Sequence, residues 1–314
     1  MYKYILKRLL FLIPTILGVT FIIYAVMNIT PGDPGRAILG ANAMQADVDA
    51  YNHMLGYDLP FLQKFVNYVQ DLFLKGDFGI SYFTKQPVFA EIWPRYGFSV
   101  RLALMGALLS AVIGIPLGIY AAVKQYSLWD TVPSVISFLI AAIPGFVVGM
   151  LLLYIFALKL NWLPSYGASS LRHYIMPMLA LAIPPAAQNM RFTKSSMLES
   201  IRQDYVRTAR AKGAPERTVI WKHALKNAML PVVTQMGLTL GALIAGAVVV
   251  EKLFSLPGIG SLIVDRIPFK DEPVIIGGTI LLSVCFAVIM LVVDVIYAFI
   301  DPRIKAKYVK MKGK

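Results

Sequence analysis

Several stretches of this chain run for about 20 residues or more without a charged side chain, long enough to cross the roughly 30 Å hydrocarbon core of a bilayer as an α-helix. A further stretch, Tyr174–Met190, is shorter and contains three prolines. Hydrophobic residues make up 58% of the 314. The sequence therefore predicts an all-α polytopic membrane protein with six transmembrane helices. The long stretches are Leu9–Pro31, Leu102–Val123, Thr131–Leu158, Met229–Val250 and Val274–Val293.

The first apolar stretch follows three basic residues, Lys3, Lys7 and Arg8, as the core of a cleaved signal peptide also does. Its apolar core is longer than the roughly 7–15 residues of a signal peptide, and no Ala-x-Ala cleavage site directly follows it. We therefore expect an uncleaved anchor.

Lys and Arg residues are divided unevenly between the two sides that six spans would define. With the N-terminus inside, the cytoplasmic parts are the start of the chain, the link at Lys124, segment 191–230 and the basic tail 302–314, and they hold more than half of the 30 basic residues. The long segment 32–100 on the other side has more Asp and Glu than Lys and Arg. Because basic residues favour the cytoplasmic side, both termini are predicted to be cytoplasmic and segment 32–100 external.

The net charge of +13 follows from this topology. A nucleic-acid-binding protein gathers its basic residues on one accessible face, whereas here they flank the membrane spans. We therefore expect contact with membrane lipid and no nucleic-acid partner.

The chain contains no motif for a nucleotide-binding phosphate loop, a His-Glu-x-x-His or Cys-x-x-Cys metal site, or a serine nucleophile elbow. His53, His173 and His223 lie in separate loops, and the single Cys285 falls within the last span, where a buried apolar role is favoured. We expect no enzyme activity, no cofactor and no metal. Transport against a gradient would need energy from an ion, a light-absorbing group or a partner.

Ion coupling usually leaves ionisable side chains inside the spans, where each costs about 2.5–3.5 kcal/mol. Asp294 is the clear candidate, and it lies about 10 Å from the inner helix end that Asp301 marks. A structural role is favoured over proton relay because this depth is off-centre. A proton-driven carrier is disfavoured because no basic residue lies within the spans.

The hydrophilic segment 191–230 is predicted to form two short helices that meet at a tight corner. Between Lys194 and Lys212, helical spacing relates Met197, Ile201, Tyr205 and Ala209. Gly213 suits the left-handed position after a helix, and Pro215 and Glu216 suit the first turn of the next. The residue pattern alone supports equally a docking site for a soluble partner and an amphipathic helix on anionic lipid.

The loop sequence resembles a cytoplasmic motif of bacterial ABC importer permeases, in the peptide and nickel branch. It reads Tyr205-Val-Arg-Thr-Ala-Arg-Ala-Lys-Gly213, then Trp221-Lys-His-Ala-Leu-Lys-Asn-Ala-Met-Leu-Pro231. The family pattern is Glu-Ala-Ala, three residues, Gly, and later Leu-Pro, which Ala209, Gly213 and Leu230-Pro231 match. Arg207 and Thr208 stand where Glu and the first Ala would be, as in the peptide-branch form.

The resemblance extends over nearly the whole chain. The long external segment is similar to that of the first of two paired permeases. Its helical apolar face is expected to pack against the spans, with partner contact as the alternative; the face comprises Phe61, Phe65, Val69 and Phe73. The other segments that resemble this branch are Thr30-Pro31-Gly32-Asp33-Pro34, Gly76-Asp77-Phe78-Gly79-Ile80-Ser81, Phe254-Ser-Leu-Pro-Gly-Ile-Gly260 and Asp301-Pro302-Arg303.

The resemblance implies a multi-pass permease subunit in the bacterial inner membrane that forms half of the pathway of an ATP-driven short-peptide importer. Its implied partners are a second homologous permease, two ATP-binding subunits that hydrolyse ATP, and an external solute-binding protein. The corner in loop 205–231 would dock on one ATPase, so that ATPase closure rocks the spans between two states. The expected coupling residues are Arg207, Ala209, Arg210, Ala211, Lys212, Gly213, Ala214 and Glu216, with Arg207 and Arg210 at the rim.

Import of nickel or another small solute by a transporter of the same family is the close alternative. Alternative functions from other classes of protein are an ion-driven carrier, a channel and a membrane scaffold without transport. Gln235 and Thr239 are candidates for the pathway lining. Glycines in two spans are expected to serve helix contact rather than a pore; they are Gly114, Gly118, Gly237, Gly241 and Gly246. We expect a first helix with its external segment (1–100), a five-helix core (101–301) and a tail (302–314).

Overall fold

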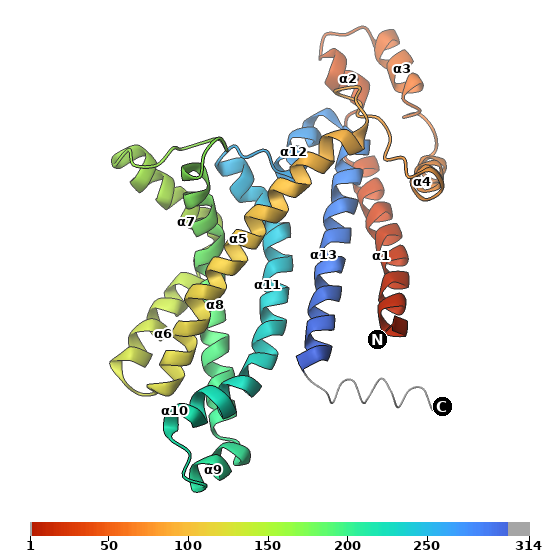
Figure 1. Cartoon of the computed structure of the whole chain (residues 1–314). Helices are drawn as coiled ribbons and strands as arrows, with labels where there is room; N and C mark the ends of the chain where they lie inside the picture. Colours follow the sequence, from red (N-terminus) through yellow and green to blue (C-terminus); the bar gives the residue numbers. More distant parts are fainter. Residues whose placement is uncertain (1, 301–314) are drawn as a thin grey trace. The chain divides into compact units, whose positions relative to one another are not determined.

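The computed structural model describes residues 2–300, without the side chains at 2–5, 7–9, 245–246, 294 and 296–300 (Figure 1). The closing motif Asp301-Pro302-Arg303, the tail 302–314 and the Asp294 side chain lie outside the described part. Within that part all secondary structure is helical, apart from one isolated β-bridge between Ile80 and Pro87. The all-α prediction is confirmed.

The described residues form two compact units. The N-terminal unit comprises residues 2–100 and 255–287, and the central unit comprises residues 101–254 and 288–300. Residues 255–287 thus belong to the same compact unit as the N-terminal segment. The helices that lie wholly in the N-terminal unit are α1 (Tyr2–Ile29), α2 (Pro34–Leu39), α3 (Gln45–Met54), α4 (Phe61–Gln70), the π-helical turn η1 (Asp71–Lys75), α12 (Ile259–Arg266) and the 3₁₀ turn η4 (Ile267–Phe269).

The central unit holds the longer helices around the loop of interest, and α5 and α13 contribute residues to both units. Its helices are the second part of α5 (Val88–Val123), α6 (Leu128–Ala141), α7 (Gly145–Leu152), η2 (Leu153–Lys159), α8 (Arg172–Ile201), α9 (Asp204–Ala211), α10 (Glu216–Thr218), η3 (Val219–Ala224), α11 (Leu225–Leu253) and the end of α13 (Glu272–Ile300). Of these, η2 and η3 are π-helical.

Aromatic rings join α1 to α4 within the N-terminal unit. Phe21 meets Phe61 and Phe65 edge to face, with ring centroids 5.7 and 5.4 Å apart. Tyr24 meets Phe65 in the same way at 6.0 Å. The packing role expected for Phe61 and Phe65 is confirmed, whereas Phe73 at the far end of the stripe is 44% exposed.

Charged side chains are buried together at the start of α13, a cluster that was not predicted from the sequence. The Asp271 carboxylate accepts hydrogen bonds from the Ser81 hydroxyl at 2.5 Å and the Tyr82 N–H at 2.8 Å. Lys270 donates to the carbonyl oxygens of Met27 and Thr30. Residues from opposite ends of the chain thus satisfy one another's polar groups in the N-terminal unit, as burial requires.

The apolar stretch Thr131–Leu158 is not one continuous helix, contrary to expectation. It divides into α6 and the pair α7–η2, which are bent by 97° with respect to each other. The backbone at Pro144 is extended (φ −60°, ψ 143°), and proline lacks the N–H that a continuing helix would use. The stretch forms a broken span or a re-entrant segment.

Helices α5 and α8 pack closely through glycine within the central unit. A Cβ atom at Gly114 would lie 2.9 Å from Cβ of Asn189, and one at Gly118 would lie 2.7 Å from Cβ of Thr193. Contact this close requires the absence of a side chain. The helix-contact role predicted for Gly114 and Gly118 is confirmed.

Four helices in the described residues are long and apolar enough to cross a membrane, or five if the bent pair counts as one span. The four segments are Leu10–Ile29, Val88–Val123, Glu216–Ile244 and Glu272–Val293. The expected fourth span lies in α8, a helix of 30 residues that includes Pro177, Pro184 and Pro185. It is not among these apolar candidates.

Candidate functional site

The predicted corner forms where α9 ends and the chain turns toward α11 (Figure 1). Gly213 adopts φ +77°, the left-handed conformation that glycine enters without a steric penalty. The N–H of Ala214 donates to the Ala209 carbonyl at 3.2 Å and closes the end of α9. Pro215 is extended and immediately precedes α10, so it stands one residue before the first turn that was predicted to contain it.

The single helix predicted between Lys194 and Lys212 is wrong, because the chain breaks at Arg202 and Gln203. Helix α8 ends at Ile201, Gln203 is extended (φ −72°, ψ 151°), and α9 starts at Asp204. An acidic residue at this position interacts favourably with the N-terminal end of the new helix. The Ser200 hydroxyl donates to the Ala224 carbonyl at 2.7 Å and fixes the end of α8 against η3.

The break also changes which residues face inward. Val206 is fully buried and Ala209 is 8% exposed, whereas Tyr205 is 41% exposed. The Tyr205 hydroxyl lies 2.7 Å from the Ser200 hydroxyl. The apolar spacing predicted through Tyr205 therefore applies only up to Ile201, the end of α8. The two non-helical residues Arg202 and Gln203 change the direction in which the side chains of α9 point, so that Val206 rather than Tyr205 faces the core.

A hydrophobic core lies directly beneath the corner. It joins residues of α5, α8, α9, η3 and α11, all within the central unit. Such burial from five elements gives the corner a fixed position on the ends of α5 and α8. The core residues are Ile119, Ala122, Met197, Val206, Ala209, Val219, Ile220, Ala224 and Ala228.

Most of the predicted coupling residues lie together on the outer side of the corner. Ala209 differs from them because its side chain is in the core, and Ala214 is half-buried against that core. A Cβ atom at Gly213 would meet nothing within 4 Å, so the space beside it is open. The exposed members are Arg207, Arg210, Ala211, Lys212, Gly213 and Glu216.

Arg210 and Glu216 connect the two sides of the corner. The guanidinium donates from Nε to one carboxylate oxygen at 3.1 Å and from Nη2 to the other at 2.7 Å. This hydrogen-bonded pair raises the pKa of Arg210 above its usual value. Because both side chains are substantially exposed, at 39% and 60%, the pair orients the corner more than it stabilises the fold.

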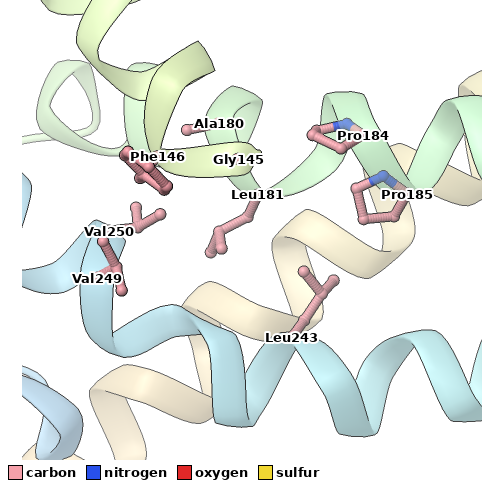
Figure 2. A pocket seen from close by; sticks show the side chains of 9 residues that line it. All are labelled: Gly145, Phe146, Ala180, Leu181, Pro184, Pro185, Leu243, Val249 and Val250. Carbon is pink, nitrogen blue, oxygen red and sulfur yellow. The ribbon is translucent and has the colours of Figure 1, made fainter. Parts of the chain in front are cut away.

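An apolar cavity of about 230 Å³ lies between α7, α8 and α11 in the central unit (Figure 2). Gly145 and Phe146 at the start of α7 form one wall, and Leu181 and Pro184 of α8 form another. The pathway candidates Gln235 and Thr239 do not line it. Thr239 is 7% exposed, and Gln235 is half-buried.

An ion pair near the corner was not predicted from the sequence. Lys194 of α8 pairs with Asp130 of α6, and their side chains are 23% and 8% exposed. Lys194 stands at the start of the helix predicted in the hydrophilic segment 191–230, and the residues near it in the chain gave it no predicted partner. A signal was present in Asp130, an acidic residue at the edge of an apolar stretch, where an unpaired charge is costly.

The geometry therefore defines a helical protein with long apolar helices and an exposed, mainly basic corner, and among the described residues no group of three or more His, Cys, Asp or Glu could hold a metal ion. Comparison with models of known protein families identifies the family of the chain. Residues 114–306 match the model for the binding-protein-dependent transport system inner membrane component, and residues 1–103 match that for the N-terminal part of such a membrane component. The chain belongs to this family of inner-membrane transport subunits, which are not enzymes.

Similar proteins align with the chain over almost its full length. The glutathione transport system permease protein GsiC of Escherichia coli K12 is 41% identical over 307 residues, which cover 98% of this chain and all of that protein. GsiC of Salmonella choleraesuis is 43% identical over the same share. The identity places the chain in the peptide and nickel branch that the motifs predicted.

Solved structures share the fold at lower identity. A chain of the MetNI methionine ABC transporter in an inward-facing conformation matches with a TM-score of 0.53 and 18% identity, and covers 67% of this chain and 96% of that one. A chain of an amino acid ABC transporter matches with a TM-score of 0.52 and 13% identity, and the match covers 69% of this chain and 94% of that one. The permease fold is therefore common to these chains.

Proposed function

We propose that this chain is a permease subunit of an ATP-driven importer of glutathione or other short peptides. The observation that carries this proposal is the 41% identity to a glutathione transport permease along 98% of the chain. A second homologous permease would complete the translocation pathway. An external solute-binding protein would deliver the cargo, and two cytoplasmic ATP-binding subunits would supply the energy.

The proposed topology has six spans and both termini in the cytoplasm. Its fourth span is the proline-containing α8, whose prolines a membrane helix tolerates when neighbouring helices satisfy the freed backbone groups. The bent pair α6 and α7–η2 counts as the third span. The excess of Lys and Arg in the segments between alternate spans supports this orientation.

The exposed corner is the proposed contact with one ATPase. The open space at Gly213 allows a partner's backbone to approach. The contact surface comprises Arg207, Arg210, Ala211, Lys212, Gly213 and Glu216. Ala209 and Ala214 act from below, because they anchor the surface in the core. Arg207 and Arg210 lie at the rim, where charge mainly affects association rate and orientation.

The decisive experiment is reconstitution of the chain with its second permease, both ATP-binding subunits and the binding protein in liposomes. Uptake of labelled glutathione that requires ATP and the binding protein supports the proposal, and dipeptides and nickel in parallel assays identify the cargo class. Uptake by this chain alone would instead indicate an ion-driven carrier or a channel. Assembly without any effect of ATP on conformation would indicate a scaffold.

The corner is tested by Gly213→Asp, for which Gly76→Asp is a matched control. Both glycines have positive φ, +77° and +66°, and at neither would a Cβ atom meet anything within 4 Å. The backbone strain is therefore similar, but Gly76 lies in the segment proposed to be external. We expect Gly213→Asp to abolish ATPase assembly and Gly76→Asp to retain it; equal assembly of both variants would contradict the assignment.

Gln235 and Thr239 remain candidates for the pathway lining. A Thr239→Cys variant in a Cys285→Ser background can be labelled with a thiol reagent in the nucleotide-free and ATP-bound states. State-dependent labelling is expected for a residue of the pathway. Thr239 is 7% exposed in this structure, so unchanged protection in both states would assign it to helix packing instead.

A further inference from the structure

Charged and hydroxyl side chains join α6 to α8 at the base of the corner. Lys194 pairs with Asp130 and also donates to the Ser134 hydroxyl at 3.0 Å. The Asp130 carboxylate accepts the Tyr126 N–H at 3.0 Å and the Ser134 hydroxyl at 3.2 Å. This pair is shielded and hydrogen-bonded, so breaking it would leave a buried charge without its partner.

A second contact holds the same two helices one turn away. The Arg191 guanidinium of α8 lies over the Phe138 ring of α6, 4.0 Å from its centroid. Arg191 and Lys194 are one turn apart on α8, as Phe138 and Ser134 are on α6. Two successive turns of α6 are therefore attached to α8, and these attachments fix the rotation as well as the position of α6.

At the same level, α8 is fixed to the rest of the central unit. A Cβ atom at Gly118 of α5 would lie 3.1 Å from the backbone nitrogen of Lys194. One turn along α8, Met197 lies in the core beneath the corner together with Val206 and Val219. Packed contacts therefore run without a gap from the corner to Lys194, and from Lys194 to α6.

The other end of α6 leads to the cavity. After Ala141 the chain bends by 97° into α7, and the first two residues of α7, Gly145 and Phe146, form one cavity wall (Figure 2). A shift of α6 along or about its axis would therefore move this wall of the cavity.

We propose that Lys194 and Asp130 are positioning residues that make α6 follow the coupling corner, so that movement of the corner changes the cavity wall at Gly145 and Phe146. This inference rests on the proposed function for its consequence in transport, whereas the attachment itself is a property of the chain. A packed, ion-paired contact between two helices is the kind of element that transmits rigid-body movement.

The attachment is tested by spin-label distances in the assembled complex in nanodiscs. Labels at Val135→Cys on α6 and Lys222→Cys on η3, both exposed positions, are introduced in a Cys285→Ser background. Without further changes we expect one narrow distance distribution, which stays narrow when ATP and vanadate are added. Asp130→Asn and Lys194→Met should each broaden or shift this distribution.

Two further variants separate the ion pair from a general loss of structure. The double variant Asp130→Asn/Lys194→Met should be no broader than either single variant, because both changes remove the same contact. Asp71→Asn is the matched control, since its pair with Lys75 is 46% and 70% exposed, and it should leave the distribution narrow. If Asp130→Asn does not fold, Lys194→Gln replaces it.

Transport gives the second readout. The number of ATP molecules hydrolysed per glutathione imported should rise at least threefold in Asp130→Asn and Lys194→Met and stay unchanged in Asp71→Asn. Wild-type-like distances in both single variants, or additive broadening in the double variant, would overturn the inference. If the wild-type complex neither assembles with ATPases nor imports glutathione, the proposed function fails, while the same distances measured in the chain alone in nanodiscs still decide whether the pair holds α6.

Discussion

Gly118 of α5 lies so close to Met190 of α8 that a Cβ atom at residue 118 would be 2.5 Å from the Met190 carbonyl oxygen. Backbone atoms on a packed helix cannot move aside as the end of a flexible side chain can. Glycine at this position therefore sets how closely the two helices approach, and it does so at the level where α8 carries Lys194.

Gly118→Ala is accordingly expected to destabilise the protein. The added methyl group forces α5 and α8 apart, and overpacking of this kind costs about 1–3 kcal/mol. The thermal midpoint of the purified protein in nanodiscs is the measurement. Gly97→Ala on the same helix, where a Cβ atom would meet nothing within 4 Å, should be neutral or stabilising by up to about 1 kcal/mol. A larger loss in Gly97→Ala would contradict the packing explanation.

Lys270→Met is expected to destabilise the N-terminal unit. Lys270 is 5% exposed and donates to the Met27 carbonyl at 3.2 Å and the Tyr57 hydroxyl at 3.1 Å. Methionine keeps much of the volume but leaves buried acceptors without a donor, at a cost of about 1–3 kcal/mol. Chemical denaturation of the purified protein would show this loss. Lys75→Met removes an exposed pair and should change stability by less than about 1 kcal/mol.

His53 is expected to titrate above its ordinary pKa of 6.5. The Asp58 carboxylate lies 2.8 Å from Nδ1 and raises the pKa of His53, chiefly through their hydrogen bond, while the same bond lowers the pKa of Asp58. A raised histidine pKa stabilises the fold at pH values below 6.5, and that contribution disappears as pH rises through the folded pKa. The Asp58 contribution is lost at the acidic end, as pH falls through its lowered pKa.

NMR of a selectively labelled histidine measures this shift. Asp58→Asn should return the pKa of His53 to near 6.5, because the amide carries no charge. His223→Gln removes a second histidine resonance and aids assignment without changing the titration of His53. An unchanged pKa in Asp58→Asn would show that the pair does not form in solution.

Glu216→Gln is expected to weaken association with the ATPase while leaving the stability of the fold nearly unchanged. The Arg210–Glu216 pair is exposed, so its loss should change the free energy of unfolding by less than about 1 kcal/mol. Arg210 would lose its fixed orientation, and association with the ATPase should weaken by less than about tenfold, as for a charge at the rim of an interface. Pull-down of the ATPase across a concentration series measures this effect. Complete loss of assembly would place Glu216 at the centre of the contact instead.

The position of the corner could be predicted from local chemistry. Gly213 suits a left-handed backbone, and Pro215 and Glu216 favour a new helix after it, so three residues within four positions mark the turn. The apolar spacing placed Ala209 on an inward face, but it placed Tyr205 there as well and did not predict the burial of Val206. The buried face of α9 depends on the break at Arg202 and Gln203 and on the core that α5, η3 and α11 provide, and neither can be read from helical spacing along the segment.

The bend in the third apolar stretch had a visible signal in Pro144. Prolines also occur inside helices of this protein, such as Pro177, Pro184 and Pro185 in α8, so a proline alone does not decide between a bend and a continuing helix. Neighbouring helices decide it, since they determine whether the freed backbone groups find other partners.

The sequence by itself determined the all-helical membrane fold, the family and the place of the turn at Gly213, because apolar length, motif and backbone conformation are properties of short segments. Only the tertiary structure decided which charges are buried and with which partners. The Asp271 carboxylate accepts a hydrogen bond from Ser81, which lies 190 residues away in the sequence, and Lys194 forms an ion pair with Asp130 on another helix. A buried charge is stabilised only by a partner in direct contact, and that contact exists only once the helices have packed.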